Sequence, residues 1–214
     1  MRADQEFLLP DEILIFGCGG HARSVADIIL AAAPHTKILF FDEGGEPGER
    51  VLGFPVLSTL PGGRGACILA LGDNKRREEL WKSLQGESWI RVIAPSSHRG
   101  HLSEIGRGCF VGSFAHIGPE ARIGENTIIN TGAIIEHEVV IGSHSHVAPN
   151  ATIAGRSQIG DRVFIGAGAT VRDSVKIGSD VIIGAGAVVV KNLLEPGCYV
   201  GLPAQALERV QVRL

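Results

Sequence analysis

Aliphatic residues recur at every sixth position through the second half of the chain. A small or β-branched residue lies two positions before each of them, and no hexad is interrupted. A period of six fits neither an amphipathic helix nor an alternating strand, and it is typical of a parallel β-helix in which three hexads form one triangular coil. The fifteen aliphatic positions, which predict about five coils, are Ile105, Val111, Ile117, Ile123, Ile129, Ile135, Ile141, Val147, Ile153, Ile159, Ile165, Val171, Ile177, Ile183 and Val189.

The residue after each aliphatic is Gly in nine of the fifteen hexads and Asn at position 130. Because glycine adopts a positive φ without steric cost, we expect these residues to form the corners of the coils. Three of the five remaining positions fall between residues 136 and 154, and departures from a regular pattern are often functional. The five are Glu136, Ala148, Ala154, Arg172 and Val190.

The first half of the chain alternates short apolar runs with helical patterns. Strands are expected at 12–16, 37–42, 66–72 and 89–94, helices at 22–33 and 74–85, and a Gly/Pro-rich loop at 43–55. This order predicts a Rossmann-like α/β domain with a parallel sheet covered on both faces. We therefore expect an α/β domain over 12–95, a connector over 96–104, and a β-helix domain with a C-terminal cap over 103–206.

The first turn between a strand and a helix matches a dinucleotide fingerprint. Gly17, Gly19 and Ala22 have the required spacing, and Asp42 ends the next strand twenty residues on. Small residues let the backbone approach a phosphate, and the helix N-terminus supplies free N–H groups. The domain has about half the strands of an NAD-binding fold, so a nucleotide-linked ligand is favoured over NAD or a purely structural turn. Gly20 and His21 complete this turn, with His21 at its mouth.

A second turn of the same kind follows the 66–72 strand. It contains Gly72, Asp73 and Asn74, followed by Lys75 and Arg76. Ligands of open α/β sheets bind outside the carboxyl ends of the strands, so both turns should open onto one crevice. Either basic side chain could bind a phosphate there, although a solvated helix start explains each of them equally well.

His137 is the candidate for acid–base chemistry. It follows the substituted corner at Glu136 and precedes Glu138. A neutral imidazole can accept a proton from an amine or a hydroxyl group, and a neighbouring carboxylate can orient the ring and raise its basicity. His144 and His146 could instead suggest a metal site. However, the positions one coil from His137 are Pro119 and Gly155, which cannot ligate a metal, so we expect none.

Charge and cysteine usage exclude several classes. The net charge of −3 gives no reason to expect nucleic acid or an acidic membrane surface. The four cysteines are far apart and read as reduced thiols of a cytoplasmic protein. The N-terminus is too polar for a signal peptide, and no apolar stretch is long enough to enter a membrane as a spanning segment.

Four motifs together resemble one family, the bacterial sugar O/N-acyltransferases. This family includes UDP-4-amino-sugar and GDP-perosamine N-acetyltransferases and sialic acid O-acetyltransferases. The similarity covers about residues 12–206. The motifs are Gly17-Cys-Gly-Gly-His21, Leu71-Gly-Asp-Asn-Lys-Arg-Arg77, Asn130-Thr-Gly-Ala-Ile-Ile-Glu-His-Glu138 and His144-Ser-His-Val-Ala-Pro149.

The resemblance implies left-handed coils, three chains packed side by side, and acetyl-CoA as co-substrate. His137 corresponds to the general base of the family and Glu138 to its partner. Residues expected at acetyl-CoA are His146, Ala167 and Ala185. Residues expected at the nucleotide-linked sugar are Gly17, Gly19, Gly20, His21, Asp42, Gly72, Asn74 and Asn130. A homotrimer also fits the small residues near the corners, such as Ala148 and Ala154.

The expected activity is therefore acetyl transfer from acetyl-CoA to the amine of a nucleotide-linked amino sugar. Direct transfer is favoured over an acyl-enzyme, because no cysteine or serine is visibly paired with His137. O-acetylation of a sialic-acid-type sugar and a non-catalytic nucleotide-sugar scaffold remain alternatives. The nucleotide base is left open among uridine, guanosine, thymidine and cytidine compounds.

Overall fold

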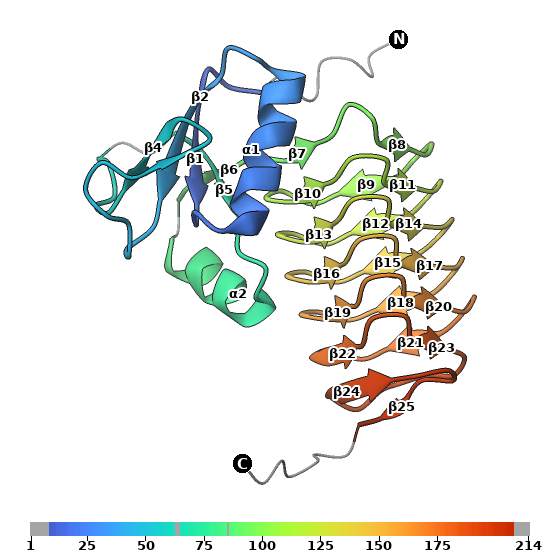
Figure 1. Cartoon of the computed structure of the whole chain (residues 1–214). Helices are drawn as coiled ribbons and strands as arrows, with labels where there is room; N and C mark the ends of the chain where they lie inside the picture. Colours follow the sequence, from blue (N-terminus) through green and yellow to red (C-terminus); the bar gives the residue numbers. More distant parts are fainter. Residues whose placement is uncertain (1–8, 63–64, 85, 208–214) are drawn as a thin grey trace, which may run out of the picture.

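The computed structural model describes residues 9–62, 65–84 and 86–207. A small α/β domain lies beside a tall three-sided solenoid, and the coils advance along its axis from the N-terminal to the C-terminal end (Figure 1). This arrangement confirms the predicted fold class, an α/β domain followed by a parallel β-helix. The expected helix end at Gln85 and the residues after 207 lie outside the described residues.

The α/β domain is built on a sheet with the strand order β3-β4-β2-β1-β5-β6, in which every pair is parallel except β3 with β4. β1 is central because its Ile13 and Ile15, with neighbouring Phe16, are buried and pair with strands on both sides. The elements are β1 (Glu12–Phe16), α1 (Gly20–Ala32), β2 (Lys37–Phe41), β3 (Arg50–Val51), β4 (Phe54–Leu57), β5 (Ala66–Leu69), α2 (Asn74–Ser83) and β6 (Ser88–Trp89).

Two expectations for this domain were wrong. The loop predicted over 43–55 contains the antiparallel hairpin β3–β4, whose turn residues Leu52 and Gly53 both have positive φ. The strand predicted over 89–94 is two short strands, because β6 pairs with β5 whereas β7 (Val92–Ile93) pairs with β10 of the solenoid. The first coil therefore begins near residue 92, and the expected connector 96–104 is already part of it.

Short strands stack into the three faces of the solenoid. The first face carries β7, β10 (Phe110–Val111), β13 (Ile128–Ile129), β16 (His146–Val147), β19 (Phe164–Ile165), β22 (Val181–Ile183), β24 (Gly197–Val200) and β25 (Gln205–Ala206). The second carries β8 (His98–Arg99), β11 (His116–Ile117), β14 (Ile134–Ile135), β17 (Thr152–Ile153), β20 (Thr170–Val171) and β23 (Val188–Val189). The third carries β9 (Glu104–Ile105), β12 (Arg122–Ile123), β15 (Val140–Ile141), β18 (Gln158–Ile159) and β21 (Lys176–Ile177).

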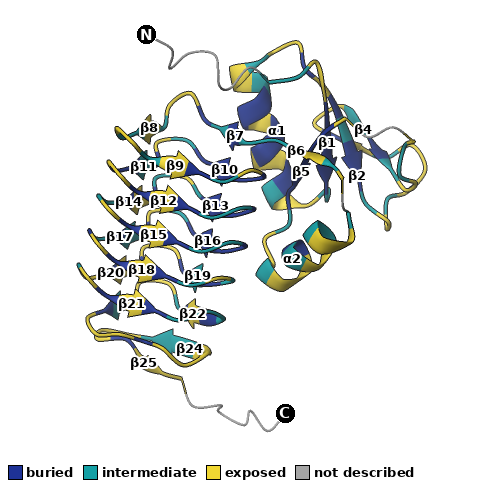
Figure 2. Ribbon diagram, turned by 180° about the vertical axis from the view of Figure 1, so that it is seen from behind, coloured by how far each residue is buried: buried dark blue, intermediate teal, exposed yellow. Residues whose placement is uncertain are grey.

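All fifteen aliphatic positions of the hexads belong to one continuous core inside the coils. Partners on adjacent coils are eighteen residues apart, as in the pairing of Ile117 with Ile135 and of Ile135 with Ile153. The small residues two positions earlier are also buried, apart from half-buried Ser103, because the narrow interior leaves no room for larger side chains. Figure 2 shows buried segments in the successive coils, whereas β24 and β25 at the C-terminal end are half-buried or exposed.

The glycines after the aliphatic residues are required for a different reason from the positive φ that was predicted. A positive φ occurs three residues after fourteen of the fifteen aliphatics, mostly at non-glycine residues such as Phe114, Glu138 and Arg156. The glycines are needed because of space. A Cβ at Gly112 would lie 2.6 Å from the backbone N of Thr131, and one at Gly118 would lie 2.7 Å from the backbone of the next coil. Close stacking of coils therefore selects glycine at these positions.

Candidate functional site

The two strand–helix turns of the α/β domain open onto one cavity, as expected. The cavity has a volume of about 310 Å³, and its lining includes Gly17–His21, Asp42, Gly72 and Arg76. Gly17 has φ +99, which favours glycine, and Asp42 accepts hydrogen bonds from the N–H of Gly44 and the thiol of Cys18. Burial and this hydrogen bond to Asp42 raise the pKa of Cys18. The thiol is therefore protonated at neutral pH.

The two helix N-termini at this cavity differ in their capping. Asp73 caps α2, since its carboxylate accepts a hydrogen bond from the N–H of Arg76 at 2.8 Å. The N-cap residue of α1 is Gly19, which has no side chain to cap the helix, and α1 has no acidic residue in its first turn. The first N–H groups of α1 therefore remain available, and this end of the helix favours an anion.

His21 and His146 lie at the junction between the α/β domain and the first face of the solenoid. Their ring centroids are 6.2 Å apart, and His21 packs edge-on against Phe110 at 4.9 Å. The pKa of His21 is lowered to about 3 and that of His146 to about 4, mainly by burial. The neighbouring His146 contributes to the shift of His21, and the charge of Arg77 contributes to both shifts. Both rings are therefore uncharged at neutral pH.

His146 also connects two of the predicted substrate residues. Its Nδ1 lies 3.4 Å from the carbonyl oxygen of Gly72, and its Nε2 lies 3.2 Å from the Nδ2 of Asn130. A neutral ring protonated on Nδ1 satisfies both contacts, donating to Gly72 and accepting from Asn130. Asn74 is engaged at both ends, since its Oδ1 accepts from Arg77 and its Nδ2 donates to the carbonyl of Val163.

Next to Asn74, a second cavity continues from the Gly72 turn along the first face of the solenoid. It has a volume of about 690 Å³, and Gly72, Lys75, Phe164 and Ile182 are among its lining residues. The two cavities share Gly72 and Asp73, so a ligand held at the Gly17–His21 turn could extend along the solenoid.

His137 lies at a corner of the solenoid between β14 and β15, and not on the face that carries the α/β domain. Its Nδ1 is 2.9 Å from the Oε2 of Glu138, and the two side chains are 42% and 51% exposed. With Nδ1–H donating to the carboxylate, Nε2 keeps its lone pair as a proton acceptor. The ring lies over Gly155, where a Cβ would come within 2.5 Å of Nε2.

Ala167 and Ala185 lie at a different corner, after β19 and β22 on successive coils. Both are exposed, and the carbonyl of Ala167 accepts a hydrogen bond from the N–H of Gly186. The structure thus brings together the residues of the two turns with His146 and Asn130. Within one chain, it leaves His137 and Ala167 at separate corners.

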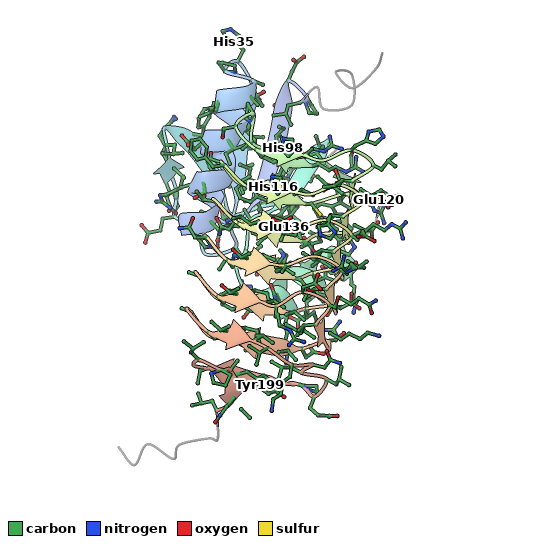
Figure 3. All side chains as sticks on the ribbon, turned by 90° about the vertical axis from the view of Figure 1, so that its right-hand side faces the viewer. His35, His98, His116, Glu120, Glu136 and Tyr199 are labelled. Carbon is green, nitrogen blue, oxygen red and sulfur yellow. The ribbon has the colours of Figure 1, made fainter. Side chains whose placement is uncertain are left out.

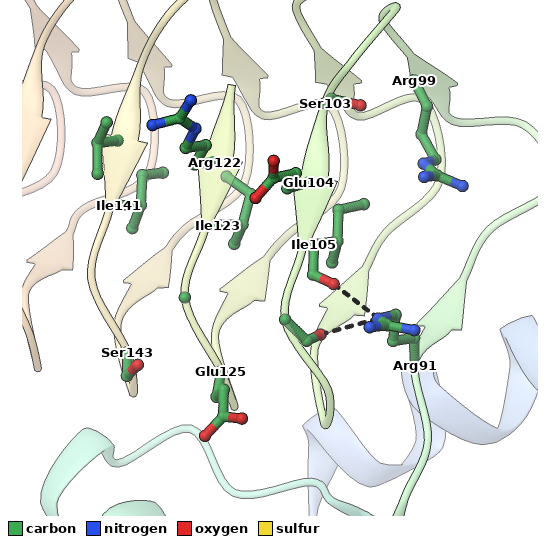
Figure 4. A pocket seen from close by; sticks show the side chains of 13 residues that line it. Arg91, Arg99, Ser103, Glu104, Ile105, Arg122, Ile123, Glu125, Ile141 and Ser143 are labelled. Atoms are coloured by element: carbon green, nitrogen blue, oxygen red, sulfur yellow. Dashed lines mark hydrogen bonds between the residues drawn. The ribbon is translucent and has the colours of Figure 1, made fainter. Parts of the chain in front are cut away.

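A third hollow, on the third face of the solenoid, contains none of the predicted site residues. It has a volume of about 620 Å³, and Arg91, Arg99 and Arg122 surround Glu104 and Glu125 (Figure 4). Arg91 is held there by hydrogen bonds from its Nε to the carbonyls of Ile105 and Gly106. Since neither a histidine nor a cysteine lines it, and none of the residues expected at the sugar or at acetyl-CoA does, we do not assign the reaction to this hollow.

The described residues contain no group of three His, Cys, Asp or Glu side chains that could hold a metal ion. His144 is instead hydrogen-bonded through Nδ1 to the Nδ2 of Asn126 at 2.9 Å. Neither of the two helices in the described residues is long and apolar enough to cross a membrane.

Sequence reasoning missed Arg77, a fully buried side chain of α2 that contacts both domains. A signal was present in the helical periodicity. Arg77 lies on the same stripe as Leu80, Trp81 and Leu84, which pack on the sheet. A charged residue that begins such an apolar stripe is a candidate for a buried contact.

Two known families match the chain. The PglD N-terminal domain matches residues 12–84, and the bacterial transferase hexapeptide matches residues 103–136, 120–155 and 156–191. These matches, together with the fold, define the chain as an acyltransferase with hexapeptide repeats. No curated protein sequence matches it.

Solved structures are similar over nearly the whole chain. The acetyltransferase domain of PglB from Neisseria gonorrhoeae is 28% identical with a TM-score of 0.86, covering 92% of this chain and 100% of that one. A perosamine N-acetyltransferase variant from Caulobacter crescentus, in complex with CoA and GDP-perosamine, is 32% identical with a TM-score of 0.83, covering 92% and 97%. WeeI from Acinetobacter baumannii is 28% identical with a TM-score of 0.85, covering 91% and 99%. The chain belongs to this family of bacterial sugar acyltransferases.

Proposed function

We propose that the protein transfers an acetyl group from acetyl-CoA to the amine of a nucleotide-linked amino sugar. The observation that carries the proposal is the His137–Glu138 pair, an oriented imidazole with a free Nε2 at an exposed corner. Structures similar to this chain contain acetyl-CoA in one case and CoA with GDP-perosamine in another. The uncapped N-terminus of α1 supports a diphosphate in the cavity of the α/β domain.

In the proposed reaction, the amine nitrogen attacks the thioester carbonyl carbon of acetyl-CoA. An amide bond forms, the C–S bond breaks, and the nitrogen loses one proton to Nε2 of His137. The proton then passes to the departing sulfur, which leaves as the CoA thiol. Glu138 stabilises the charged imidazole between these steps, because its carboxylate accepts the Nδ1–H.

The site requires a second copy of the chain. His137 and the α/β domain occupy different sides of the solenoid, so one chain alone does not bring the proposed base to its own nucleotide cavity. The second face supports assembly, because none of the outward residues of its strands is an Asp, Glu, Lys or Arg. They are His98 and His116, both labelled in Figure 3, followed by Ile134, Thr152, Thr170 and Val188.

The third face differs, since its outward residues include the charged Glu104, Arg122 and Lys176. We therefore propose a homotrimer assembled through the second face, in which His137 of one copy meets the nucleotide cavity of the next. Light scattering should give about three times the chain mass. A stable monomer would contradict this arrangement.

The catalytic assignment is tested by His137→Ala and Glu138→Gln. His137→Ala should lower kcat about 10²–10⁴-fold, the range for removing positioned acid–base catalysis, with a much smaller change in substrate affinity. Glu138→Gln should cost less, because it weakens the base without removing it. An exposed structural histidine would instead tolerate alanine. More than half of the wild-type activity in the alanine variant would refute the assignment.

A further inference from the structure

Arg77 is a buried charge, and no carboxylate of the described residues forms a hydrogen bond or an ion pair with it. Its side chain is fully buried, and the acceptors of its hydrogen bonds within the described residues are five backbone carbonyls and one side-chain amide oxygen. Burial lowers its pKa to about 10, so it remains charged at neutral pH. A buried cation is costly unless its donors are satisfied, and here all are turned toward oxygen.

The acceptors belong to both domains. Nε donates to the carbonyl of Asn126 at 3.1 Å, and Nη2 donates to the carbonyls of His144 and Ser145 at 2.8 and 3.1 Å. Asn126 and His144 are eighteen residues apart and lie on successive coils. Nη1 donates in the opposite direction, to the carbonyls of Leu71 at 2.9 Å and Gly72 at 3.4 Å.

Further contacts reinforce this junction. The Nδ2 of Asn126 donates to the carbonyl of Arg77 at 3.4 Å, while Asn74 accepts from Arg77 at 2.8 Å and donates to Val163 on the next coil at 3.1 Å. The first turn of α2 therefore rests on three successive coils. The Gly72 turn, which lines both cavities beside α2, is held to the solenoid through the same guanidinium.

We infer that Arg77 is a positioning residue that fixes the Gly72 turn, and with it the nucleotide cavity, relative to the solenoid. The inference rests on the proposed function, because it assigns the nucleotide to that cavity. Only the planar, five-donor guanidinium reaches carbonyls on both sides at once; a lysine ammonium has three donors at one point. Loss of the guanidinium hydrogen bonds should let the Gly72 turn move relative to the solenoid, without changing the corner at Ala167 and Ala185.

The test compares Arg77→Met and Arg77→Lys with a matched control in the same helix. Glu78→Gln removes the Glu78–Arg162 ion pair, which also joins α2 to the solenoid at 3.2 Å, but leaves the hydrogen bonds of Arg77 intact. Binding of UDP, GDP, dTDP, CMP and acetyl-CoA is measured by calorimetry at a temperature at which circular dichroism shows the variants folded.

We expect Arg77→Met to lower the affinity for the nucleotide that wild type binds by at least tenfold, and the affinity for acetyl-CoA by less than twofold. Arg77→Lys should fall between Arg77→Met and wild type, and Glu78→Gln should match wild type. Folded Arg77→Met with unchanged nucleotide affinity, or with equal loss of both ligands, would overturn the inference. If Arg77→Met does not fold, nucleotide affinity of Arg77→Lys equal to wild type overturns it, and a selective loss supports it. Wild type that binds none of the four nucleotides would refute the proposed function itself, and with it the role of Arg77.

Discussion

Acid should destabilise the junction between the two domains, because His21 and His146 are buried there in uncharged form. Burial is the main cause of the low pKa of each ring, and the positive charge of Arg77 contributes to both. An unfolded chain exposes these rings, and an exposed histidine has a pKa of about 6.5. Below that value the unfolded state binds protons that the folded state does not, so acid favours unfolding.

The magnitude follows from the shift of His146, which is 8% exposed and has a pKa of about 4. A shift from 6.5 to 4 corresponds to about 3 kcal/mol at 1.36 kcal/mol per pKa unit. This amount of the free energy of unfolding is fully present above pH 6.5 and is lost as the pH falls from 6.5 through 4. His21 adds to the loss, but the two rings influence each other, so we use His146 alone as the measure.

Urea unfolding between pH 7.5 and 4.5, followed by the fluorescence of the stacked Trp81 and Trp89, measures this loss. His146→Phe has no ring to protonate at this position, so its free energy of unfolding should fall less with decreasing pH than that of wild type. Between pH 7.5 and 4.5 the difference in free energy of unfolding between variant and wild type should change by about 2–3 kcal/mol in favour of the variant. His35→Asn, at an exposed position, is the control and should follow wild type. A wild-type-minus-variant difference that is constant with pH would refute the reasoning.

Three other substitutions test the site and the core. Gly155→Ala should displace the ring of His137, lowering kcat in the wild-type background but having no further effect in His137→Ala; a loss in both backgrounds would assign Gly155 another role. A Cβ at Gly19 would meet no atom within 4 Å, so Gly19→Val should stay folded, as judged by its Tm, while raising the KM of the nucleotide sugar and sparing acetyl-CoA affinity. Ile153→Ala in the fully buried core should cost about 2–5 kcal/mol in urea unfolding, and a cost below about 1 kcal/mol would contradict tight stacking.

The solenoid could be predicted because its period is local and repeated. Every inward aliphatic position follows from the sixfold spacing, since each coil uses the same backbone geometry. The role of the glycines could not be derived in the same way. Their requirement comes from the next coil, eighteen residues away, and a preference for positive φ looks the same in a sequence as a lack of space for Cβ.

The α/β turns were recognisable for the same local reason, whereas the junction between the domains was not. Arg76 and Arg77 are adjacent and chemically identical, yet Arg76 is exposed at the cavity and Arg77 is buried against the solenoid. Their difference depends on carbonyls at Asn126 and His144, which only the folded coils bring to α2. The burial of His21 and His146 has the same long-range origin.

The geometry of the coils also explains why the corner sequence is informative about chemistry. At fourteen of the fifteen corners, the third residue after an aliphatic takes a positive φ, and its side chain can be as different as those of Phe114, Glu138 and Arg156. The coil geometry therefore does not select one chemical type of residue at this position. At the corner that carries His137, successive coils place the pairs His101-Leu102, Pro119-Glu120, His137-Glu138, Gly155-Arg156 and Asp173-Ser174. Only one pair joins an imidazole to a carboxylate, and the residue one coil further on is a glycine, which leaves room for the ring.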